Sequence, residues 1–435
     1  MLLEFKIKNY KSFAEEAVFS MIPAPKQSGL DYSILKEKVG SRTRKALCSA
    51  VIYGPNASGK TNMIGAMETL KAIILRGNIR NTDMKLSPNA ATSLLELIPN
   101  CNMESDSTEL SITFIENGLL FSYSLVMELG KFLEENFPRK IIEEKLTVND
   151  KLVFLRGKEF EVALPAIIKP YANTSIKRIS PKTKEIAKSS LSDTELFLVN
   201  GFKTIFAQNL VSMITDWFRN KFRVIYRLDA LKGKQKFTDP KENAIYIETT
   251  ITEAAKEFGI TSNALGYRAN NEGDDMILCS IFNDNKMAIP AEAFESYGTI
   301  RFINEFPLII NALLNGGTLV MDEFDASIHP MALMNIISIF HNDEINKKHA
   351  QLIFNTHNPI FLDASLFRRD EIKFVERNNE TNCSTHYALS DFKTASGIRK
   401  GEDYMSNYFV NRYGAISDID FSPILEKIIN GTEVK

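Results

Sequence analysis

Apolar and polar residues alternate in three parts of the N-terminal third of the chain. Residues 3–8 alternate between apolar and charged side chains, and similar alternation returns over 108–128 and 146–155. Alternation with a period of two is typical of half-buried strands. The dipeptides Asn117-Gly118 and Asn149-Asp150 interrupt the two later stretches, and such pairs favour tight turns. We therefore predict one strand and two hairpins, which together form a mixed or antiparallel β lobe.

The pattern changes between about 165 and 270, where the chain becomes polar and helix-like. Within this region, Leu196–Phe222 carries apolar side chains at the spacing of an α-helix. No heptad repeat is sustained, so a long coiled-coil arm is not expected. From about 295 to 377 the pattern predicts helix, strand, helix and strand in turn. Residues 23–44 are polar, and we expect a loop or an irregular hairpin there.

A phosphate-binding loop stands early in the chain. Residues 54–61 read Gly-Pro-Asn-Ala-Ser-Gly-Lys-Thr, between the apolar run Ala50–Tyr53 and the helix-forming stretch Met63–Ala72. Glycines let backbone N–H groups curl around a phosphate chain, while the lysine reaches the β- and γ-phosphates and the threonine hydroxyl sits on Mg²⁺. The candidate nucleotide-binding residues of this loop are Gly54, Asn56, Ser58, Gly59, Lys60 and Thr61.

A second candidate element closes an apolar run, Thr318–Met321, with two acids, Asp322 and Glu323. A buried strand delivers such carboxylates to its C-terminal end, where ligands bind in open α/β sheets. We predict that Asp322 holds Mg²⁺ together with Thr61, and that Glu323 orients the attacking water. The alternative is a core strand that ends in surface acids, and the phosphate loop upstream favours the catalytic interpretation.

Two further segments carry candidate chemistry. Leu352–Pro359 predicts another buried strand, which ends near His357; the alternative is a structural or exposed histidine. Glu295–Thr299 contains Ser296 and Gly298 at the start of a predicted helix. A helix start of this kind is an anion site made of backbone N–H groups, a hydroxyl and the dipole end. The alternative is an ordinary turn before a helix. The other four histidines are assigned no role.

The spacing of these elements predicts an α/β protein with three parts. About 235 residues separate the phosphate loop from the Ser296 element, so we infer an insertion between them. We predict an N-terminal ATPase lobe with an antiparallel β subdomain over 1–165. An inserted helical lobe would follow over 166–285, and a C-terminal ATPase lobe over 286–435.

Composition restricts the class of protein. The 435 residues carry a net charge of −2, so any nucleic-acid binding must be local. The four cysteines are scattered without paired spacing, which argues against a disulfide framework or a zinc site and suits a reducing cytosol. No apolar run reaches about 18 residues, so no membrane span is expected. The first residues do not look like a signal peptide, and we expect a cytoplasmic protein.

Taken in order, these elements resemble the ABC-type ATPases of the SMC/RecF/RecN branch, whose start Ile7–Phe13 also matches. More closely, the chain resembles AAA-type ATPases of bacterial abortive-infection and phage-defence operons, such as AbiL/RloA-type proteins and the ATPase subunit of PARIS. The segments that carry this closer resemblance are 52–61, 295–299, 322–330, 356–358, 368–376 and 411–416. The resemblance implies the fold of a P-loop ABC-type ATPase head.

The resemblance also implies a nucleotide site shared by two copies, with ATP and Mg²⁺ as cofactors. The signature of this class contacts the γ-phosphate held by the partner, so Ser296 and Gly298 would bind nucleotide across the interface. Asp325 would lie in the D-loop along that interface, and His357 would be the switch histidine that contacts the γ-phosphate. Lys60, Glu323 and His357 form the implied catalytic set. We expect a homodimer or a higher homo-oligomer through this head interface.

Two features depart from the family pattern. Glu295 stands at the first signature position, where transporters prefer leucine. Many members of the wider class carry a glutamine that links the metal to the inserted lobe. No glutamine of this chain stands at a convincing position for that role; the four are Gln27, Gln208, Gln235 and Gln351.

The implied function is a sensor and scaffold of a phage-defence system that binds and hydrolyses ATP. It would control a separately encoded effector, such as a nuclease, in response to a phage trigger. One alternative is a RecF-like DNA-repair clamp, because basic residues with aromatic neighbours occur between 177 and 236. The same residues also fit a solvated helix face. A third hypothesis is an OLD-type nuclease that uses Glu376, Asp418 and Asp420, although only about 70 residues follow the His357 segment.

Overall fold

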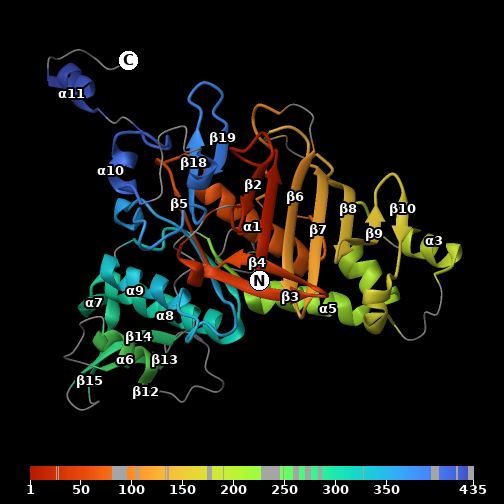
Figure 1. Ribbon diagram of the computed structural model, residues 1–435, viewed down its shortest axis with the longest axis horizontal. Coiled ribbons are helices and arrows are strands. Elements are labelled where there is room, and N and C mark those ends of the chain that lie inside the picture. Colours follow the sequence, from red (N-terminus) through yellow and green to blue (C-terminus); the bar gives the residue numbers. More distant parts are fainter. Residues whose placement is uncertain are drawn as a thin grey trace.

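The computed structural model contains two large sheets, which lie side by side in Figure 1. The structure describes residues 1–25, 27, 29–80, 96–103, 107–132, 134, 137–173, 179–189, 191–226, 245–247, 249–257, 264–269, 276–282, 287–326, 328–392, 401–417 and 420–429. None of the helices in these ranges is long and apolar enough to cross a bilayer.

The first sheet has seven antiparallel strands in the order β10-β9-β8-β7-β6-β1-β2. Its strands are β1 (Leu2–Lys8), β2 (Ala17–Ser20), β6 (Thr108–Glu116), β7 (Leu119–Glu128), β8 (Lys140–Val148), β9 (Lys151–Arg156) and β10 (Phe160–Val162). Asn117, Gly118, Asn149 and Asp150 have positive φ values, as the primed hairpin turns require. Both predicted hairpins, β6–β7 and β8–β9, are confirmed.

The second sheet has six strands in the order β11-β16-β17-β5-β18-β19, all parallel except β19. They are β5 (Ser49–Tyr53), β11 (Phe222–Ile225), β16 (Thr318–Met321), β17 (Gln351–Asn355), β18 (Ile372–Arg377) and β19 (Ser384–Ala388). We call this the main sheet. Because neighbouring parallel strands end at one edge, the residues that follow β5, β16 and β17 lie close together.

Both faces of the main sheet are buried, which explains its near-continuous apolar strands. Along β5, Ala50 and Ile52 belong to the core that contains α1 (Lys60–Arg76) and the seven-stranded sheet. Val51 and Tyr53 belong to the core on the other face, beneath α8 (Tyr297–Asn315) and α9 (Pro330–Phe340). The helix α1 therefore lies between the two sheets, and α8 and α9 cover the opposite face (Figure 1).

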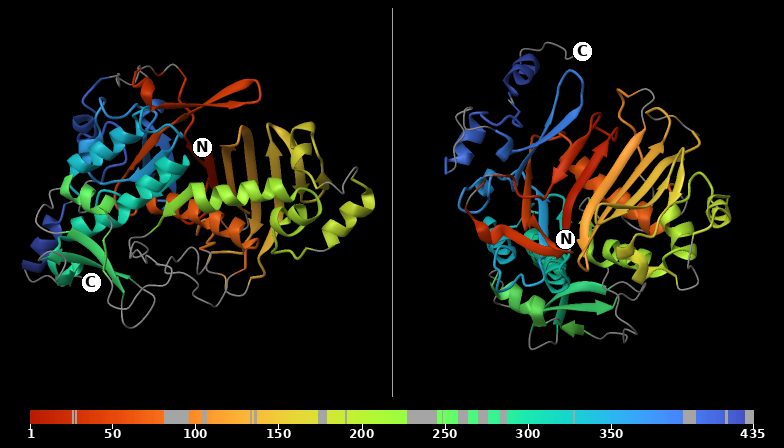
Figure 2. Two further views of the ribbon diagram at one scale, coloured as in Figure 1. Left: turned by 90° about the horizontal axis from the view of Figure 1, so that it is seen from below. Right: turned by 45° about the vertical axis from the view of Figure 1, so that its right-hand side comes forward.

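A run of short helices crosses the inner face of the seven-stranded sheet (Figure 2). It consists of η3 (Leu198–Phe202), α4 (Lys203–Ile205), α5 (Gln208–Asp216) and η4 (Trp217–Lys221). The Trp217 ring stacks on Phe114 of β6 at 3.9 Å between centroids and on Phe222 at 5.0 Å. This confirms the apolar helical stripe predicted over Leu196–Phe222. Its apolar side chains cover the sheet.

The region 166–285, predicted as an inserted helical lobe, contains strands as well as helices. Its strand β11 pairs in parallel with β16 and so belongs to the main sheet. A four-stranded antiparallel sheet follows, in the order β12-β13-β14-β15. The further elements of this region are η2 (Ala166–Tyr171), α3 (Pro181–Ser189), β12 (Ile245–Ile247), α6 (Thr249–Glu257), β13 (Ala264–Ala269) and β14 (Met276–Phe282). The last strand of the small sheet, β15 (Met287–Pro290), and the helix α7 (Ala291–Phe294) follow just beyond it. The β11 segment joins the sheet beside β16, with Phe222 and Val224 buried.

The polar stretch near the start contains a short helix, η1 (Asp31–Ser33), and a regular hairpin of β3 (Ile34–Val39) and β4 (Arg42–Leu47). We expected a loop or an irregular hairpin there. The hairpin is ordered because Leu35, Val39 and Ala46 pack in a small core with Met1 and Leu3. The remaining elements are η6 (Pro359–Phe361), η7 (Leu389–Asp391), α10 (Tyr404–Phe409) and α11 (Ser422–Ile429).

Candidate functional site

The loop after β5 wraps tightly into the start of α1. Gly54 and Gly59 have φ values of 156° and 112°, a region that favours glycine. A Cβ at Gly54 would collide with the backbone carbonyl of Val375, and one at Gly59 with the hydroxyl of Ser384. The loop therefore packs its backbone directly against β18 and β19, which fixes its position at the start of α1.

Lys60, the first residue of α1, is buried beneath this loop. Its ammonium donates hydrogen bonds to the carbonyls of Gly54 at 2.8 Å and Pro55 at 2.9 Å. Burial lowers the pKa of Lys60 to about 8, against the opposing effect of the nearby carboxylates of Asp322 and Glu323. The loop thus holds the ammonium in place, while the nearby carboxylates offset only part of the cost of burying its charge. An anion bound in the loop would stabilise the charged form.

Thr61 joins the phosphate loop to the end of β16. The Thr61 hydroxyl donates to Asp322 Oδ1 at 3.1 Å, and the side-chain amide of Asn355 donates to the same oxygen at 2.6 Å. A hydroxyl and a carboxylate are the hard oxygen donors that Mg²⁺ prefers beside a phosphate. The Ser58 hydroxyl in the loop is buried and has no partner among the described residues. These residues therefore fit a magnesium nucleotide.

The backbone of Glu323 is held from both sides. Its φ of 52° is unusual for a residue with a side chain. Its N–H donates to Asn355 Oδ1, and its carbonyl accepts from the guanidinium of Arg301 on α8. Arg301 also donates to Glu305 at 2.7 Å, and burial raises the pKa of Glu305 to about 7 although Arg301 opposes the rise. The position of Glu323 is therefore coupled to α8.

These segments enclose a pocket of about 340 Å³ at the end of the main sheet. Its lining residues are Asn56, Ala57, Ser58, Gly59, Lys60, Thr61, Asn62, Glu323, Asn355, His357 and Arg377. Burial, together with the charge of Lys60, lowers the pKa of His357 below its usual value, although Asp325 and Asp322 oppose this. The His357 imidazole is therefore mainly neutral at pH 7 and can accept or donate a hydrogen bond in the pocket.

Five candidate residues do not line this pocket. Gly54 and Asp322 lie directly behind it, hydrogen-bonded to Lys60 and Thr61. The other three are Asp325, Ser296 and Gly298. Asp325 accepts a hydrogen bond from Thr356 Oγ1 at 2.6 Å, which links the segment after β16 to the segment after β17. Ser296 caps α8 and accepts from Thr299 N at 3.2 Å, so the helix predicted to begin there is present. Gly298, in the first turn of α8, is buried. Within one chain, Ser296 and Gly298 are not part of the phosphate-loop pocket.

A protein-family model described as "AAA domain, putative AbiEii toxin, Type IV TA system" matches residues 49–363. The chain belongs to this family. The match runs from β5 through the phosphate loop and Asp322 to beyond His357. No curated protein matches the chain.

Two solved structures are similar to this AAA family member at low identity. One is the SMC head domain from Thermotoga maritima, with 13% identity, a TM-score of 0.35 and coverage of 89% of this chain and 98% of that one. The other is an SmcHead bound to the C-winged helix domain of ScpA, with 14% identity, a TM-score of 0.39 and coverage of 91% and 99%.

Four pocket residues of this AAA family member were not predicted as site residues: Ala57 within the predicted loop, and Asn62, Asn355 and Arg377 outside it. Asn355 ends β17 beside β16 and contacts both Asp322 and Glu323. The sequence offered one signal for Asn355: it is a polar residue at the end of an apolar strand, as Asp322 is after β16. Arg377 ends β18 and donates to the carbonyl of Ala57 at 3.4 Å. Only the strand order, which the sequence does not show, places it there.

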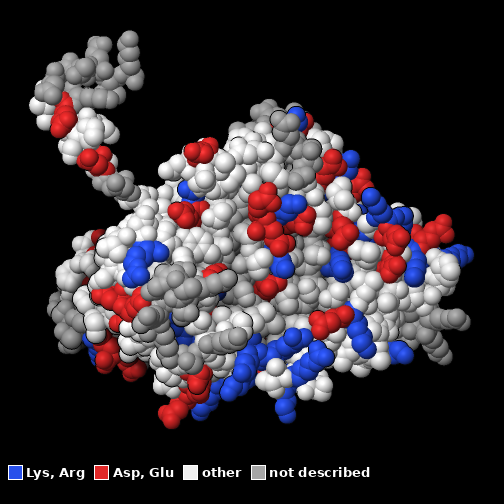
Figure 3. Space-filling model, turned by 45° about the horizontal axis from the view of Figure 1, so that its top comes forward, with Lys and Arg blue, Asp and Glu red and all other residues white. Residues whose placement is uncertain are grey.

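The basic residues considered for nucleic-acid binding fall partly outside the described ranges: Lys177, Arg178, Arg227, Lys232, Lys234 and Lys236. Of the others, Arg219 pairs with Asp216 at 3.3 Å and Lys221 with Glu116 at 2.7 Å. The neighbouring aromatics are core residues rather than stacking surfaces: Phe218, Phe222 and Tyr226 are all buried. The face shown in Figure 3 carries both signs of charge, with Lys and Arg side chains gathered along its lower edge.

The acids considered for an OLD-type nuclease do not form a metal group among the described residues. Asp418 lies outside the described ranges. Glu376 accepts a hydrogen bond from Tyr387 at 3.2 Å. Asp420 accepts from Ser422 N at 2.8 Å, just before α11. These contacts offer no support for a second catalytic centre.

Proposed function

We propose that this chain binds ATP with Mg²⁺ in the phosphate-loop pocket and hydrolyses the γ-phosphate. One observation carries the proposal: Lys60 and Thr61 meet Asp322 and Glu323 at one sheet edge. About 260 residues separate the first pair from the second in the sequence. Phosphoryl transfer needs positioning and charge neutralisation rather than covalent chemistry. Thr61 and Asp322 would hold Mg²⁺, which when bound neutralises phosphate charge, and Lys60 would contribute the second positive charge.

Glu323 and His357 are the proposed residues that position the attacking water. Both line the same pocket as Lys60. Asn355 and Arg301 hold the Glu323 backbone by hydrogen bonds, so the point from which its side chain extends is fixed. A neutral His357 can donate to a phosphate oxygen while its second nitrogen accepts.

Two copies would close on the nucleotide. Ser296 and Gly298 lie outside the pocket of their own chain, and Ser296 begins the 19-residue helix α8. Large apolar side chains beside Ser296 are exposed, with 53% of Phe294 and 62% of Tyr297 accessible. Exposed apolar groups of this size often mark an interaction surface. A second copy would cover them and bring its helix start to the γ-phosphate.

Such an ATP-driven closure would serve as the sensor and scaffold of a defence system that controls a separately encoded effector. The family description, which names a putative AbiEii toxin of a type IV toxin–antitoxin system, supports a place in a system with a partner gene. Its test is phage challenge of bacteria that carry the gene with its neighbouring genes. Protection that depends on Lys60 supports the role, and protection that persists in Lys60→Ala contradicts it.

The enzymatic part has its own test, the release of phosphate from ATP with Mg²⁺. We expect Glu323→Gln to slow hydrolysis by about 100-fold or more while ATP binding persists, because the water-orienting carboxylate is lost. Glu344→Gln, at an exposed turn after α9, is the matched control and should leave the rate unchanged. A Glu323→Gln protein as active as the wild type would contradict the assignment.

A further inference from the structure

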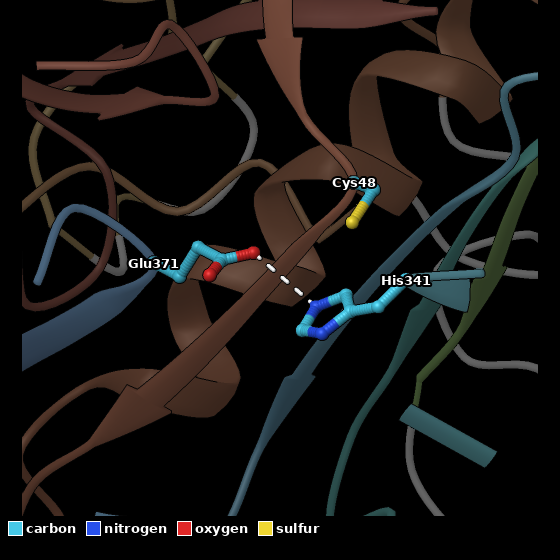
Figure 4. Close-up of side chains that lie close together, drawn as sticks. All are labelled: Cys48, His341 and Glu371. Atoms are coloured by element: carbon cyan, nitrogen blue, oxygen red, sulfur yellow. Dashed lines mark ion pairs between the residues drawn. The ribbon is translucent and has the colours of Figure 1, made fainter. Parts of the chain in front are cut away.

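Three metal-ligating side chains meet at the opposite end of the main sheet from the phosphate loop. The ligand atoms of Cys48, His341 and Glu371 all lie within 4.8 Å of one another, and all three residues are buried (Figure 4). Cys48 directly precedes β5 and Glu371 directly precedes β18, the parallel neighbour of β5. His341 follows the last residue of α9. The fold thus gathers residues from three distant parts of the sequence.

We propose that Cys48, His341 and Glu371 supply three of the ligands of a divalent transition-metal ion, with Zn²⁺ as the best match. A thiolate, an imidazole and a carboxylate are the ligand types that zinc takes in proteins, at about 2.0–2.3 Å from the metal. Atoms within 4.8 Å of one another leave a point at most about 2.8 Å from all three, so the side chains would move slightly inward to reach bonding distance. A hard cation such as Mg²⁺ would avoid the thiolate.

The charge balance of the site favours an ion. The Glu371 side chain is fully buried and accepts from the Ser49 hydroxyl at 2.8 Å and from the Arg368 N–H at 2.8 Å. The nearest counter-charge is the His341 imidazole, whose Nε2 lies 3.4 Å from Glu371 Oε1 and which is charged only when protonated (Figure 4). The guanidinium of Arg368 donates instead to Asp370, at 2.9 Å. A divalent cation with one thiolate and one carboxylate makes a neutral unit, which a buried site tolerates far better than a lone charge.

The surroundings already resemble the second shell of a metal site. The Ser49 hydroxyl lies 2.8 Å from Glu371 Oε1 and 2.9 Å from His341 Nε2. It would keep its hydrogen bond to the carboxylate and release the imidazole nitrogen when that nitrogen binds the ion. The Arg368 N–H fixes the other carboxylate oxygen. The Cys48 N–H donates to the Ser33 carbonyl at 2.9 Å, which holds the cysteine backbone. Outer hydrogen bonds of this kind typically change metal affinity by about 10- to 100-fold.

The site lies one side chain below the surface. The Tyr32 ring is 5.7 Å from the His341 ring and remains 45% exposed, so moving Tyr32 would open a path for an ion. A nucleophilic role for Cys48 fits less well. Burial, followed by the negative charge of Glu371, raises the pKa of the Cys48 thiol well above its ordinary value. A buried thiol with a raised pKa is inert toward substrates but still exchanges its proton for a metal.

The expected role is to hold the fold together. An ion here would connect Cys48 to His341 and Glu371, which lie roughly 290 and 320 residues later in the chain. Metal binding to the folded form alone adds to stability. This inference does not depend on the proposed ATPase function, because the cluster shares no residue with the nucleotide pocket.

The test is metal content and cobalt titration of the full chain. We expect about one zinc per chain after purification without chelators. The metal-stripped protein should give a thiolate-to-cobalt absorption band on addition of Co²⁺. Cys48→Ser should abolish the band. Cys279→Ser is the matched control and should retain it, because Cys279 is also buried but belongs to no metal group among the described residues.

Two results would overturn the proposal: no thiolate band in the wild type, or a band that persists in Cys48→Ser. Glu371→Gln keeps the thiol and the side-chain shape, and should weaken Co²⁺ binding by at least about 10-fold. The wild-type titration is informative even if one variant does not fold. Added Zn²⁺ should also raise the melting temperature of the wild type but not that of Glu371→Gln, and equal shifts would contradict a site at Glu371.

Discussion

The two ends of the main sheet carry polar groups that differ in backbone strain and in access to solvent. At the end of β5 that leads into α1, the Ser58 hydroxyl has no hydrogen-bond partner among the described residues. Residues of the loop and Glu323 also adopt positive φ values. At the start of the same strand, none of Cys48, His341 and Glu371 has a positive φ, and the cluster is closed from solvent. Both groups are brought together by the same parallel strands.

The difference shows what each end is built to do. Strained backbone and unsatisfied polar groups persist where a ligand will complete them, and they cost stability in the free protein. A closed and relaxed cluster instead adds to stability or binds a small ion without reshaping the fold. Mutations at the first end should therefore change nucleotide chemistry, and mutations at the second should change stability.

The largest expected effect is loss of hydrolysis in Lys60→Ala. Without its ammonium, the loop loses the charge that its Gly54 and Pro55 carbonyls hold in place. We expect phosphate release to fall by about 100-fold or more. Lys182→Ala, an exposed residue of α3, is the matched control. Cys48→Ser should also hydrolyse ATP at the wild-type rate per folded molecule, and a loss as deep as that of Lys60→Ala would remove the contrast between the two ends.

The next effect is on stability, from Arg301→Ala. This change leaves the buried Glu305 without its ion-pair partner and frees the Glu323 carbonyl. We expect a loss of about 3 kcal/mol in the free energy of unfolding, together with slower hydrolysis. Denaturant unfolding provides the measurement. Adding Glu305→Gln to Arg301→Ala should recover part of the stability but not the rate, and full recovery of both would refute coupling of α8 to Glu323.

A smaller effect should appear in the pH dependence of nucleotide binding. Burial lowers the pKa of Lys60 to about 8, so its charged form is lost as pH rises through that value. Because a phosphate favours the charged form, affinity should be full near pH 7 and fall by several-fold toward pH 9. Titration with a fluorescent ATP analogue measures this. Lys60→Arg keeps its charge throughout, so its affinity should stay flat, and a parallel decline in both proteins would assign the dependence elsewhere.

The smallest effect expected is that of Arg377→Ala. Arg377 lines the pocket and contacts the Ala57 carbonyl, so it supports the loop from the β18 side. The loss of one such hydrogen bond, worth roughly 1 kcal/mol, should weaken ATP binding by about 5-fold. Arg412→Ala, outside the pocket lining, is the control. Equal affinities in Arg377→Ala and the wild type would exclude Arg377 from the site.

Much of the nucleotide end could be predicted because its signals are local. The phosphate loop is contiguous in the sequence. Asp322 follows the apolar strand β16, and His357 lies two residues after the apolar strand β17. Turn residues such as Asn117-Gly118 marked the hairpins for the same reason. Short-range patterns determine strands and turns, so they can be inferred without the fold.

What escaped prediction depends on strand order. The proximity of Cys48, His341 and Glu371 was not predicted, because their spacing along the chain carries no signal. Only the parallel pairing of β5 with β18 places Cys48 near Glu371. The same pairing places Arg377 at the pocket, and the position of β11 in the main sheet follows from its pairing with β16.

The central claim is that each copy completes the pocket of the other, and mixed dimers test it most directly. Ser296→Asp keeps the α8 cap but sets a negative charge against the γ-phosphate, whereas Ser296→Asn keeps a neutral cap as control. Lys60→Ala and Ser296→Asp should each be inactive alone. Mixed in equal amounts, they should recover about a quarter of wild-type hydrolysis, because half of the dimers hold one intact composite site. A mixture as inactive as either variant, while Ser296→Asp still dimerises with ATP, would contradict the claim.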